Sequence, residues 1–377
     1  MKEWLKNSWY VIARACELTV ETQPLKKKLL GQNLALFIDA AGKFSAVNDV
    51  CPHMGASLSL GCVKNGNLVC PYHHFGFASS GKCAEVPSIV APGKIPSTLM
   101  VDSYPIVEKY GLLWVFMGDM PEDKRPPIVE VPEFDKPEFR SLYHDLTWRG
   151  SVRPMLENLI DFTHFSYLHA GTFGNGEHPF REDYTVKRGE YEVECTVKVK
   201  LNPDNWFFPP VPELGENPDV TVRCRYHVPT LVVNDFTVGK YTDVTLFTFT
   251  PIDDNEVLIR MFGCRNFDQN AVADTKLKNL GERILEEDRL VIESCVPEVL
   301  PRAIGVSVDK YLIAARNLYD KWLKAGNSVQ DHVFETNRGT RLTILPSPVR
   351  ANNETFGRSW KRREAQEKKT RKDKTTD

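Results

Sequence analysis

The C-terminal two thirds of this chain of 377 residues alternate apolar and polar positions over several short stretches. From residue 193 to 201, Val, Cys, Val, Val and Leu alternate with Glu, Thr, Lys and Lys, which is the period-two pattern of a half-buried strand. The same alternation recurs over 222–228, and 241–250 and 257–264 are two further apolar stretches of strand length. The pattern predicts an antiparallel sheet with one face against the core and the other face in water.

After these strands, apolar residues recur with the spacing of a helix. Over 276–293, a helical wheel defines an apolar arc, which consists of Leu277, Leu280, Ile284, Val291 and Ile292. Asp288 falls near the middle of this arc, whereas Glu287 sits just outside its edge, and Glu282, Glu286 and Glu293 point away. A carboxylate turned into a core is costly unless it is paired or bound to a metal. Asp288 is therefore either a metal ligand or the partner of a buried arginine. A last helix is predicted over 309–325.

The first 120 residues predict only short strands, over 34–38, 46–48, 68–69 and 111–116, separated by Gly and Asn turns. We therefore predict four segments along the chain: a small β domain at 1–120, a charged, proline-rich linker at 121–140, a second domain at 141–350, and a basic tail at 351–377. The tail is expected to be solvated and disordered, with a contact to an acidic redox partner as the alternative. An aromatic, proline-rich segment at 205–212 is either a packed loop or a pocket lid.

Composition excludes several classes of protein. The net charge of −2 gives no bulk attraction to nucleic acid. No stretch approaches the eighteen apolar residues of a membrane span, and the N-terminus lacks the apolar core of a secretory signal. The nine cysteines show no disulfide framework. These features predict a cytoplasmic protein in a reducing compartment.

Two short motifs bring cysteine and histidine together. Cys51 and His53 form C-x-H, and after sixteen residues Cys70 and His73 form C-x-x-H. Two thiolates and two imidazoles suit a [2Fe-2S] cluster in which one iron keeps both cysteines and the other takes both histidines. A zinc site is the alternative, although its usual pattern keeps the two cysteines together and the two histidines together.

A second set of candidate ligands lies about ninety residues later. Asn158, Asp161 and His164 are spaced i, i+3, i+6, which would place them on one face of a helix. His169 is five residues beyond His164, so a regular helix would turn it about 140° away. The helix must therefore end near His164 or contain a π-type turn. Two histidines and a carboxylate form the facial triad of Fe(II) oxygenases, and Asp288 is the best candidate for that carboxylate.

Together these motifs resemble those of the Rieske non-haem iron oxygenases. The family pattern N-x-x-D-x-x-H-x-x-x-x-H is matched at Asn158, Asp161, His164 and His169, and the segment around Asp288 is similar to the family's third-ligand segment. The resemblance implies a mononuclear Fe(II) held by His164, His169 and Asp288. It also implies catalytic roles for Asn158 and for Asp161, which in the family bridges to the second cluster histidine of a neighbouring subunit, here His73.

Two positions depart from the family pattern. Met54 follows the first cluster histidine where the family usually has Arg, and His74-Phe75 follows the second where Gly-Trp is usual. The loss of a cation beside the cluster affects its potential and its docking surface. His74 is next to a ligand, but the C-x-x-H spacing selects His73.

The resemblance implies an α+β protein with an N-terminal all-β Rieske [2Fe-2S] domain and a C-terminal helix-grip-like domain, in which helices cover an antiparallel sheet. It implies a homotrimeric terminal oxygenase that works without a β subunit. The expected reaction is monooxygenation of a small organic substrate, by C–H hydroxylation or by oxidative N- or O-demethylation, as in the similar purine N-demethylases. The alternatives are an electron-transfer Rieske protein, an arene dioxygenase and a zinc module without redox function.

The chain contains no phosphate-binding glycine loop. We therefore expect flavin and nicotinamide to reside on another protein, a reductase or ferredoxin that draws electrons from NAD(P)H. The identity of the substrate is not predicted, because the pocket walls come from scattered strands.

Overall fold

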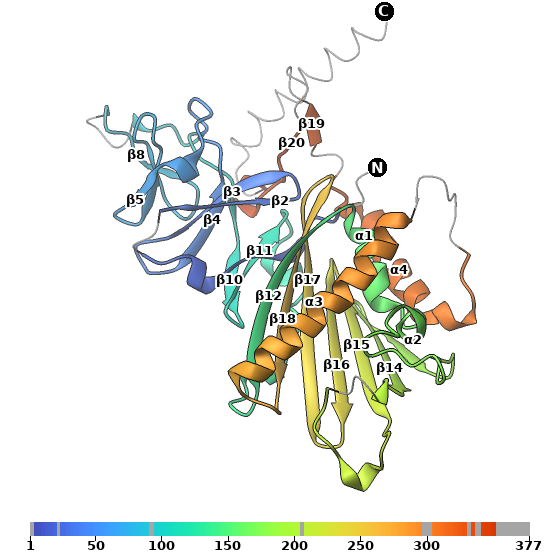
Figure 1. Cartoon of the computed structure of the whole chain (residues 1–377). Helices are drawn as coiled ribbons and strands as arrows, with labels where there is room; N and C mark the ends of the chain where they lie inside the picture. Colours follow the sequence, from blue (N-terminus) through green and yellow to red (C-terminus); the bar gives the residue numbers. More distant parts are fainter. Residues whose placement is uncertain are drawn as a thin grey trace, which may run out of the picture. The chain divides into compact units, whose positions relative to one another are not determined.

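The computed structural model describes residues 4–20, 23–89, 94–203, 207–295, 304–329, 333–335 and 341–351. Apart from its first residue, the predicted basic tail at 351–377 lies outside these ranges, as do 205–206 of the aromatic segment. The chain forms two compact units (Figure 1). One contains residues 6–126 and the chain from 329 onward, and the other contains 127–328 and the first five residues.

The first unit consists, in its described residues, of small antiparallel sheets. One has the order β1-β11-β10, with bounds Ser8–Arg14, Leu112–Met117 and Ile106–Lys109. A second has the order β2-β3-β4-β9, with bounds Leu25–Leu29, Gln32–Ile38, Phe44–Asn48 and Ser103–Tyr104. A third has the order β5-β6-β7-β8, with bounds Cys62–Lys64, Asn67–Val69, Gly76–Phe77 and Cys83–Glu85. The strands predicted within the first 120 residues are confirmed.

The C-terminal part of the chain returns to this first unit. It contributes the hairpin of β19 (Val333–Glu335) and β20 (Arg341–Thr343), followed by the short helix α5 (Pro348–Ala351). The Tyr104 hydroxyl donates to the Leu345 carbonyl at 2.8 Å. Contacts of this kind attach the C-terminal segment to the β domain.

The second unit is built on one antiparallel sheet, which has seven strands among the described residues. Its order is β12-β18-β17-β16-β15-β14-β13, with bounds Arg140–Arg149, Glu256–Arg265, Tyr241–Asp253, Leu231–Val238, Val220–His227, Glu192–Val199 and Thr185–Arg188. Every neighbouring pair is antiparallel. The alternating stretches of the sequence are strands of this sheet, as predicted.

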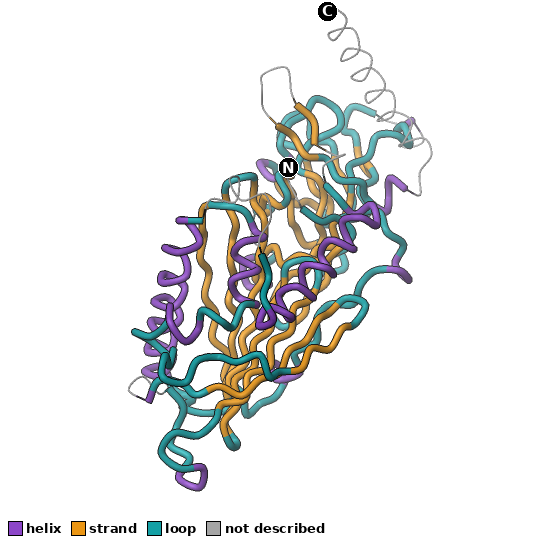
Figure 2. Tube along the Cα trace, turned by 90° about the vertical axis from the view of Figure 1, so that its right-hand side faces the viewer, coloured by secondary structure: helices purple, strands orange, loops and turns teal. Residues whose placement is uncertain are grey.

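Helices cover one face of this sheet, as Figure 2 shows. They are α1 (Val152–Ile160), α2 (Phe165–Leu168), α3 (Ala271–Ser294) and α4 (Lys310–Trp322). Helix α3 contacts β12 and α1, whereas α4 contacts β13 and β14. The Asn270 side chain caps α3 by accepting from the Ala273 backbone N–H at 3.0 Å. This layered arrangement encloses the core between the sheet and the helices.

Both predicted helices are confirmed, with one correction to the wheel. Val291 is 45% exposed, so it does not belong to the apolar arc of α3. Leu285 and Asp288 are the buried positions of α3, which places Asp288 on the core side as predicted. No helix of the described residues is long and apolar enough to cross a membrane.

Candidate metal centres

The two cysteine–histidine motifs lie on two loops of the first unit that have the same backbone hydrogen bonds. In one loop the N–H of Cys51 donates to the Ala56 carbonyl at 2.8 Å, and the N–H of Gly55 returns to the Cys51 carbonyl at 2.9 Å. In the other, Cys70 N–H donates to the Phe75 carbonyl at 2.9 Å, and His74 N–H returns to the Cys70 carbonyl at 3.0 Å. Each loop therefore presents one cysteine and one histidine in a similar way.

His74 occupies a turn position rather than a ligand position. Its φ of 58° is left-handed, and Gly55 has a φ of 79° at the equivalent place in the other loop. Glycine adopts this conformation without strain, whereas a histidine does so at some cost. The backbone thus uses residue 74 to close the loop, in agreement with the choice of His73 by spacing.

The four candidate cluster ligands divide into a buried pair and an exposed pair. Cys51 and Cys70 belong to the core of the β domain, and burial raises the pKa of the Cys51 thiol to about 11. His53 and His73 are exposed, with ring centroids 4.6 Å apart. Two buried sulfurs and two adjacent outward imidazoles fit a [2Fe-2S] cluster with its histidine-bound iron at the surface.

The second motif departs from the predicted helix. Helix α1 ends at Ile160, and Asp161 is extended, with φ −90° and ψ 120°. The Asp161 carboxylate accepts from the Thr163 backbone N–H at 2.8 Å, a local turn that competes with the helix. The prediction that Asn158, Asp161 and His164 share one helix face is therefore wrong.

Because α1 ends early, His164 and His169 do not lie on one regular helix. His164 precedes the short helix α2 and His169 follows it. The chain can thus turn both rings toward one point, which a continuous helix would prevent. The ring centroids lie 5.1 Å apart.

Asp288 completes the group from α3. Its Oδ1 lies 3.4 Å from Nε2 of His164 and 3.3 Å from Nε2 of His169. The three donor atoms all lie within 4.8 Å of one another. Atoms about 2.1 Å from one ion lie roughly 3.0–3.4 Å apart at bond angles near 90–109°. Nε2 of His164 is buried and has no hydrogen-bond partner, so the group fits a single metal ion.

Each of these three side chains is held by another polar group. Nδ1 of His164 lies 3.3 Å from the Asp161 carboxylate, and Nδ1 of His169 lies 2.9 Å from the Glu287 carboxylate. The Asn158 amide donates to Oδ1 of Asp288 at 3.1 Å. Partners of this kind fix the orientation and tautomer of a ligating histidine.

These contacts change the protonation of the site. Burial disfavours the charged form of Asp161, but the hydrogen bond and charge of His164 outweigh it and lower the pKa of Asp161. Burial alone would also lower the pKa of His169, but Asp288 and Glu287 together raise it. The two carboxylates that face this buried imidazole give the site an excess of negative charge, which a bound cation would offset.

Sequence reasoning missed Glu287. The wheel placed it outside the apolar arc, and no role was expected for it. In the structure its carboxylate also accepts from the Thr172 hydroxyl at 3.0 Å, so it is fixed on both sides. The one signal in the sequence was that Glu287 directly precedes Asp288. Consecutive residues of a helix are about 100° apart around its axis, so both side chains can reach the same site.

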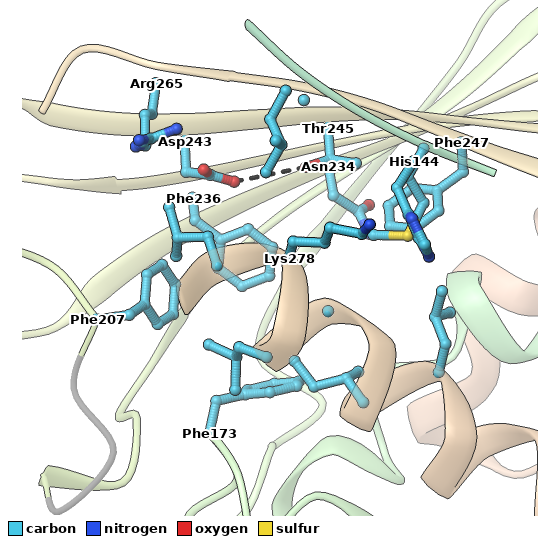
Figure 3. A pocket seen from close by; sticks show the side chains of 18 of the residues that line it. His144, Phe173, Phe207, Asn234, Phe236, Asp243, Thr245, Phe247, Arg265 and Lys278 are labelled. Atoms are coloured by element: carbon cyan, nitrogen blue, oxygen red, sulfur yellow. Dashed lines mark hydrogen bonds between the residues drawn. The ribbon is translucent and has the colours of Figure 1, made fainter. Parts of the chain in front are cut away.

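A cavity of about 170 Å³ extends from His169 and Asp288 between the sheet and α3. Its lining is mostly apolar, and Figure 3 shows aromatic side chains from several elements around it, among them Phe173, Phe207, Phe236 and Phe247. Phe207 brings the aromatic loop of the sequence into this wall. The cavity is the space in which a small organic molecule can reach the metal-binding group.

Comparison with known proteins places both units in described families. Residues 8–105 match the Rieske [2Fe-2S] domain, and residues 148–325 match the vanillate O-demethylase oxygenase C-terminal domain. The vanillate O-demethylase oxygenase subunit of a Pseudomonas species is 27% identical, covering 86% of this chain and 97% of that protein. Methylxanthine N1-demethylase of Pseudomonas putida is 26% identical, covering 86% and 89%.

The fold agrees with solved structures. The crystal structure of dicamba monooxygenase bound to 3,6-dichlorosalicylic acid has a TM-score of 0.72, 24% identity, and coverage of 86% of this chain and 98% of that one. The chain therefore belongs to the Rieske non-haem iron oxygenases. Within them it is a terminal oxygenase α subunit, a monooxygenase of the demethylase and hydroxylase branch. Its cofactors are a [2Fe-2S] cluster and mononuclear non-haem iron.

Proposed function

We propose that His164, His169 and Asp288 hold the mononuclear iron, and that the chain inserts one oxygen atom of O2 into a C–H bond of a small substrate beside it. The observation that carries this proposal is the convergence of three donor atoms at one end of an apolar cavity, where Oδ1 of Asp288 lies 3.4 and 3.3 Å from Nε2 of His164 and of His169. Three protein ligands on one side leave other positions of the metal open. Iron in this site, when reduced, supplies the activation of O2.

The chain's own residues prepare this site. Asp161 and Glu287 each accept the Nδ1 proton of one histidine, so that its Nε2 presents a lone pair to the metal. Asn158 donates to Asp288 and holds its carboxylate toward the histidines. The apolar cavity wall keeps bulk water away from the reacting C–H bond.

We propose that Cys51, His53, Cys70 and His73 hold the cluster and that an external reductase or ferredoxin reduces it. The exposed histidine pair supports electron entry at the surface. Apolar side chains surround it: Met54 is 64% and Tyr72 is 61% exposed. An exposed apolar patch around a redox centre favours docking of a protein partner.

We further propose a homotrimer, in which Asp161 links His164 to His73 of a neighbouring subunit. The Asp161 carboxylate is partly exposed, at 29%, which leaves it accessible to a second group. A cytoplasmic location is part of the same proposal, and the absence of any disulfide among the nine cysteines is consistent with it.

Oxidative demethylation is the reaction that the relatives favour, since vanillate O-demethylase and methylxanthine N1-demethylase carry it in their names. Attack on an N- or O-methyl group would release formaldehyde, whereas attack on another C–H bond would leave a stable alcohol. The test is a screen of methylated and unmethylated aromatic and heteroaromatic compounds with ¹⁸O2 and a chemical or enzymatic reductant. A hydroxylated product should carry one labelled oxygen, whereas demethylation should place the label in the released formaldehyde, trapped as it forms, and leave the ring product unlabelled. Asp288→Ala should give neither product.

A further inference from the structure

The floor of the cavity beside the metal-binding group is formed by one face of the sheet. The residues of this floor lie on neighbouring strands and pair with one another across them. Leu142 pairs with Gly263, Gly263 pairs with Thr245, and Thr245 pairs with Asn234. All four line the cavity, so a single row of residues forms the middle of its floor.

Two glycines create the space. Gly263 lies inside β18, where a Cβ would approach the Thr245 hydroxyl at 3.3 Å. Gly281 lies in the middle of α3, and a Cβ there would meet the terminal carbon of Met261 at 3.4 Å. Glycine weakens both strand and helix interiors. Gly263 lies in the floor of the cavity and Gly281 in its roof. The absence of a side chain at both positions leaves space for a ligand.

One polar atom of this row, Oδ1 of Asn234, has no hydrogen-bond partner in the protein. Asn234 is only 4% exposed, and its side-chain carbonyl is buried without a hydrogen bond. A buried polar atom left unpaired costs free energy, and a ligand that fills the cavity can supply the missing donor. Figure 3 shows Asn234 among the side chains around the cavity.

The Arg and Lys side chains that line the cavity each lie beside a carboxylate. Arg265 contacts the carboxylate of Asp274 at 2.7 Å, and Asp274 also binds Arg140 at 2.7 Å. Lys278 is half-exposed and lies 3.8 Å from Glu282. Asp243 adds a further carboxylate at the cavity wall. Arg265 keeps its Nε buried without a hydrogen-bond partner, but Asp274 offsets its charge. Because Asp243 and Asp288 add two carboxylates to the lining, an anionic ligand would meet more negative than positive charge.

From these observations we propose that the cavity selects an uncharged substrate with a single aromatic or heteroaromatic ring, whose N–H or O–H group donates to Asn234. An apolar cavity of roughly 150 Å³ binds benzene, so the 170 Å³ between Gly263 and Gly281 matches one ring. This proposal rests on the proposed function, because it assumes that the substrate of the oxygenase occupies this cavity.

The test is equilibrium binding to the full-length holoenzyme under anaerobic conditions, measured by calorimetry without turnover. The probes are phenol, anisole, benzoate and 1-naphthol. We expect phenol to bind about three- to tenfold tighter than anisole, which lacks the donor. Benzoate and 1-naphthol should bind at least tenfold more weakly than phenol. Tighter binding of benzoate, or no binding of phenol, would overturn the proposal.

Variants separate the two parts of the proposal. Asn234→Leu should make phenol and anisole bind equally, and an equal loss for both ligands would contradict the role of Asn234.

Gly281→Ala should raise the melting temperature, because alanine is the better helix former, yet weaken phenol binding about tenfold. Asn279→Ala is the matched control, since Asn279 is an exposed residue of α3 outside the cavity lining; it should leave binding unchanged. Unchanged phenol binding in Gly281→Ala would contradict the role of that glycine.

Failure of this proposal is distinguishable from failure of the proposed function. A protein that binds phenol as expected but oxidises no compound in the screen would contradict only the function. A protein that oxidises an anionic compound but binds no phenol would contradict only the substrate class.

Discussion

The two candidate metal centres differ in how the chain builds them. The cluster site comes from two short loops, each of which supplies one cysteine and one histidine within four residues, and its imidazoles face the surface. The iron site is largely buried and joins two histidines on either side of α2 to a carboxylate on α3, more than a hundred residues later. A centre that exchanges electrons with a partner benefits from exposure, whereas one that activates O2 benefits from a closed, apolar surrounding. Variants at the two centres test this division of labour.

The largest effect is expected for Asp288→Ala. Loss of a buried ligand with 1% exposure should remove the mononuclear iron and abolish product formation. The cluster should keep its visible absorption, because its ligands lie in the other unit. Metal analysis together with the absorption spectrum checks both parts, and bleaching of the cluster in this variant would contradict the independence of the two centres.

Asp161→Asn should separate electron transfer from iron binding. The amide keeps the size of the side chain but loses its charge and one acceptor. We expect most of the iron and the cluster spectrum to remain, while reoxidation of the pre-reduced cluster by O2 and substrate becomes slower by orders of magnitude. Single-turnover absorption measurements follow this step. Reoxidation at the wild-type rate would mean that the bridge lies elsewhere, and full activity in a monomer would remove the intersubunit route.

Glu287→Gln should weaken iron binding by roughly 10–100-fold, the usual cost of losing a partner of a ligating histidine. Glutamine retains the size of the side chain, so a purely structural role would leave the affinity unchanged. Competition with a metal chelator measures it. Glu286→Gln, on the exposed side of the same helix, is the control and should match the wild type. From the sequence alone we expected Glu287 to matter little, and this experiment decides between the two views.

The smallest effect concerns Asp243, whose pKa burial raises to about 6. Because its folded pKa lies above the unfolded value of 3.8, the stability it contributes is complete below about pH 4 and is lost as the pH rises through 6. Asp243→Asn should therefore stabilise the protein at pH 8 by roughly 1–2 kcal/mol, and by much less at pH 4.5. Chemical denaturation at the two values tests this; an equal effect at both would show that Asp243 does not titrate in this range.

The same contrast explains what could be predicted from the sequence. The strands were predictable because period-two alternation is a local signal, and the cluster ligands because they are close in sequence. Asp288 was found only because a carboxylate interrupts an apolar helix face. An end of the helix near His164 was predicted from the spacing of the two histidines, but its exact place at Asp161 was not, since the competing bond from Thr163 depends on local turn geometry. Glu287 acts through His169 and Thr172, which are far away in the sequence, and Asn234 reaches the cavity only through the pairing of distant strands. The domain boundaries at 120, 140 and 350 remain predictions.

The central claim is that one chain holds both a [2Fe-2S] cluster and a separate mononuclear iron. The most direct test is the metal and acid-labile sulfide content of the native protein and of Cys70→Ala. The native protein should contain roughly three irons and two sulfides per chain. Cys70→Ala should lose both sulfides and the cluster spectrum and keep about one iron at the His164 site. Zinc in place of iron, or native protein without labile sulfide, would contradict the claim.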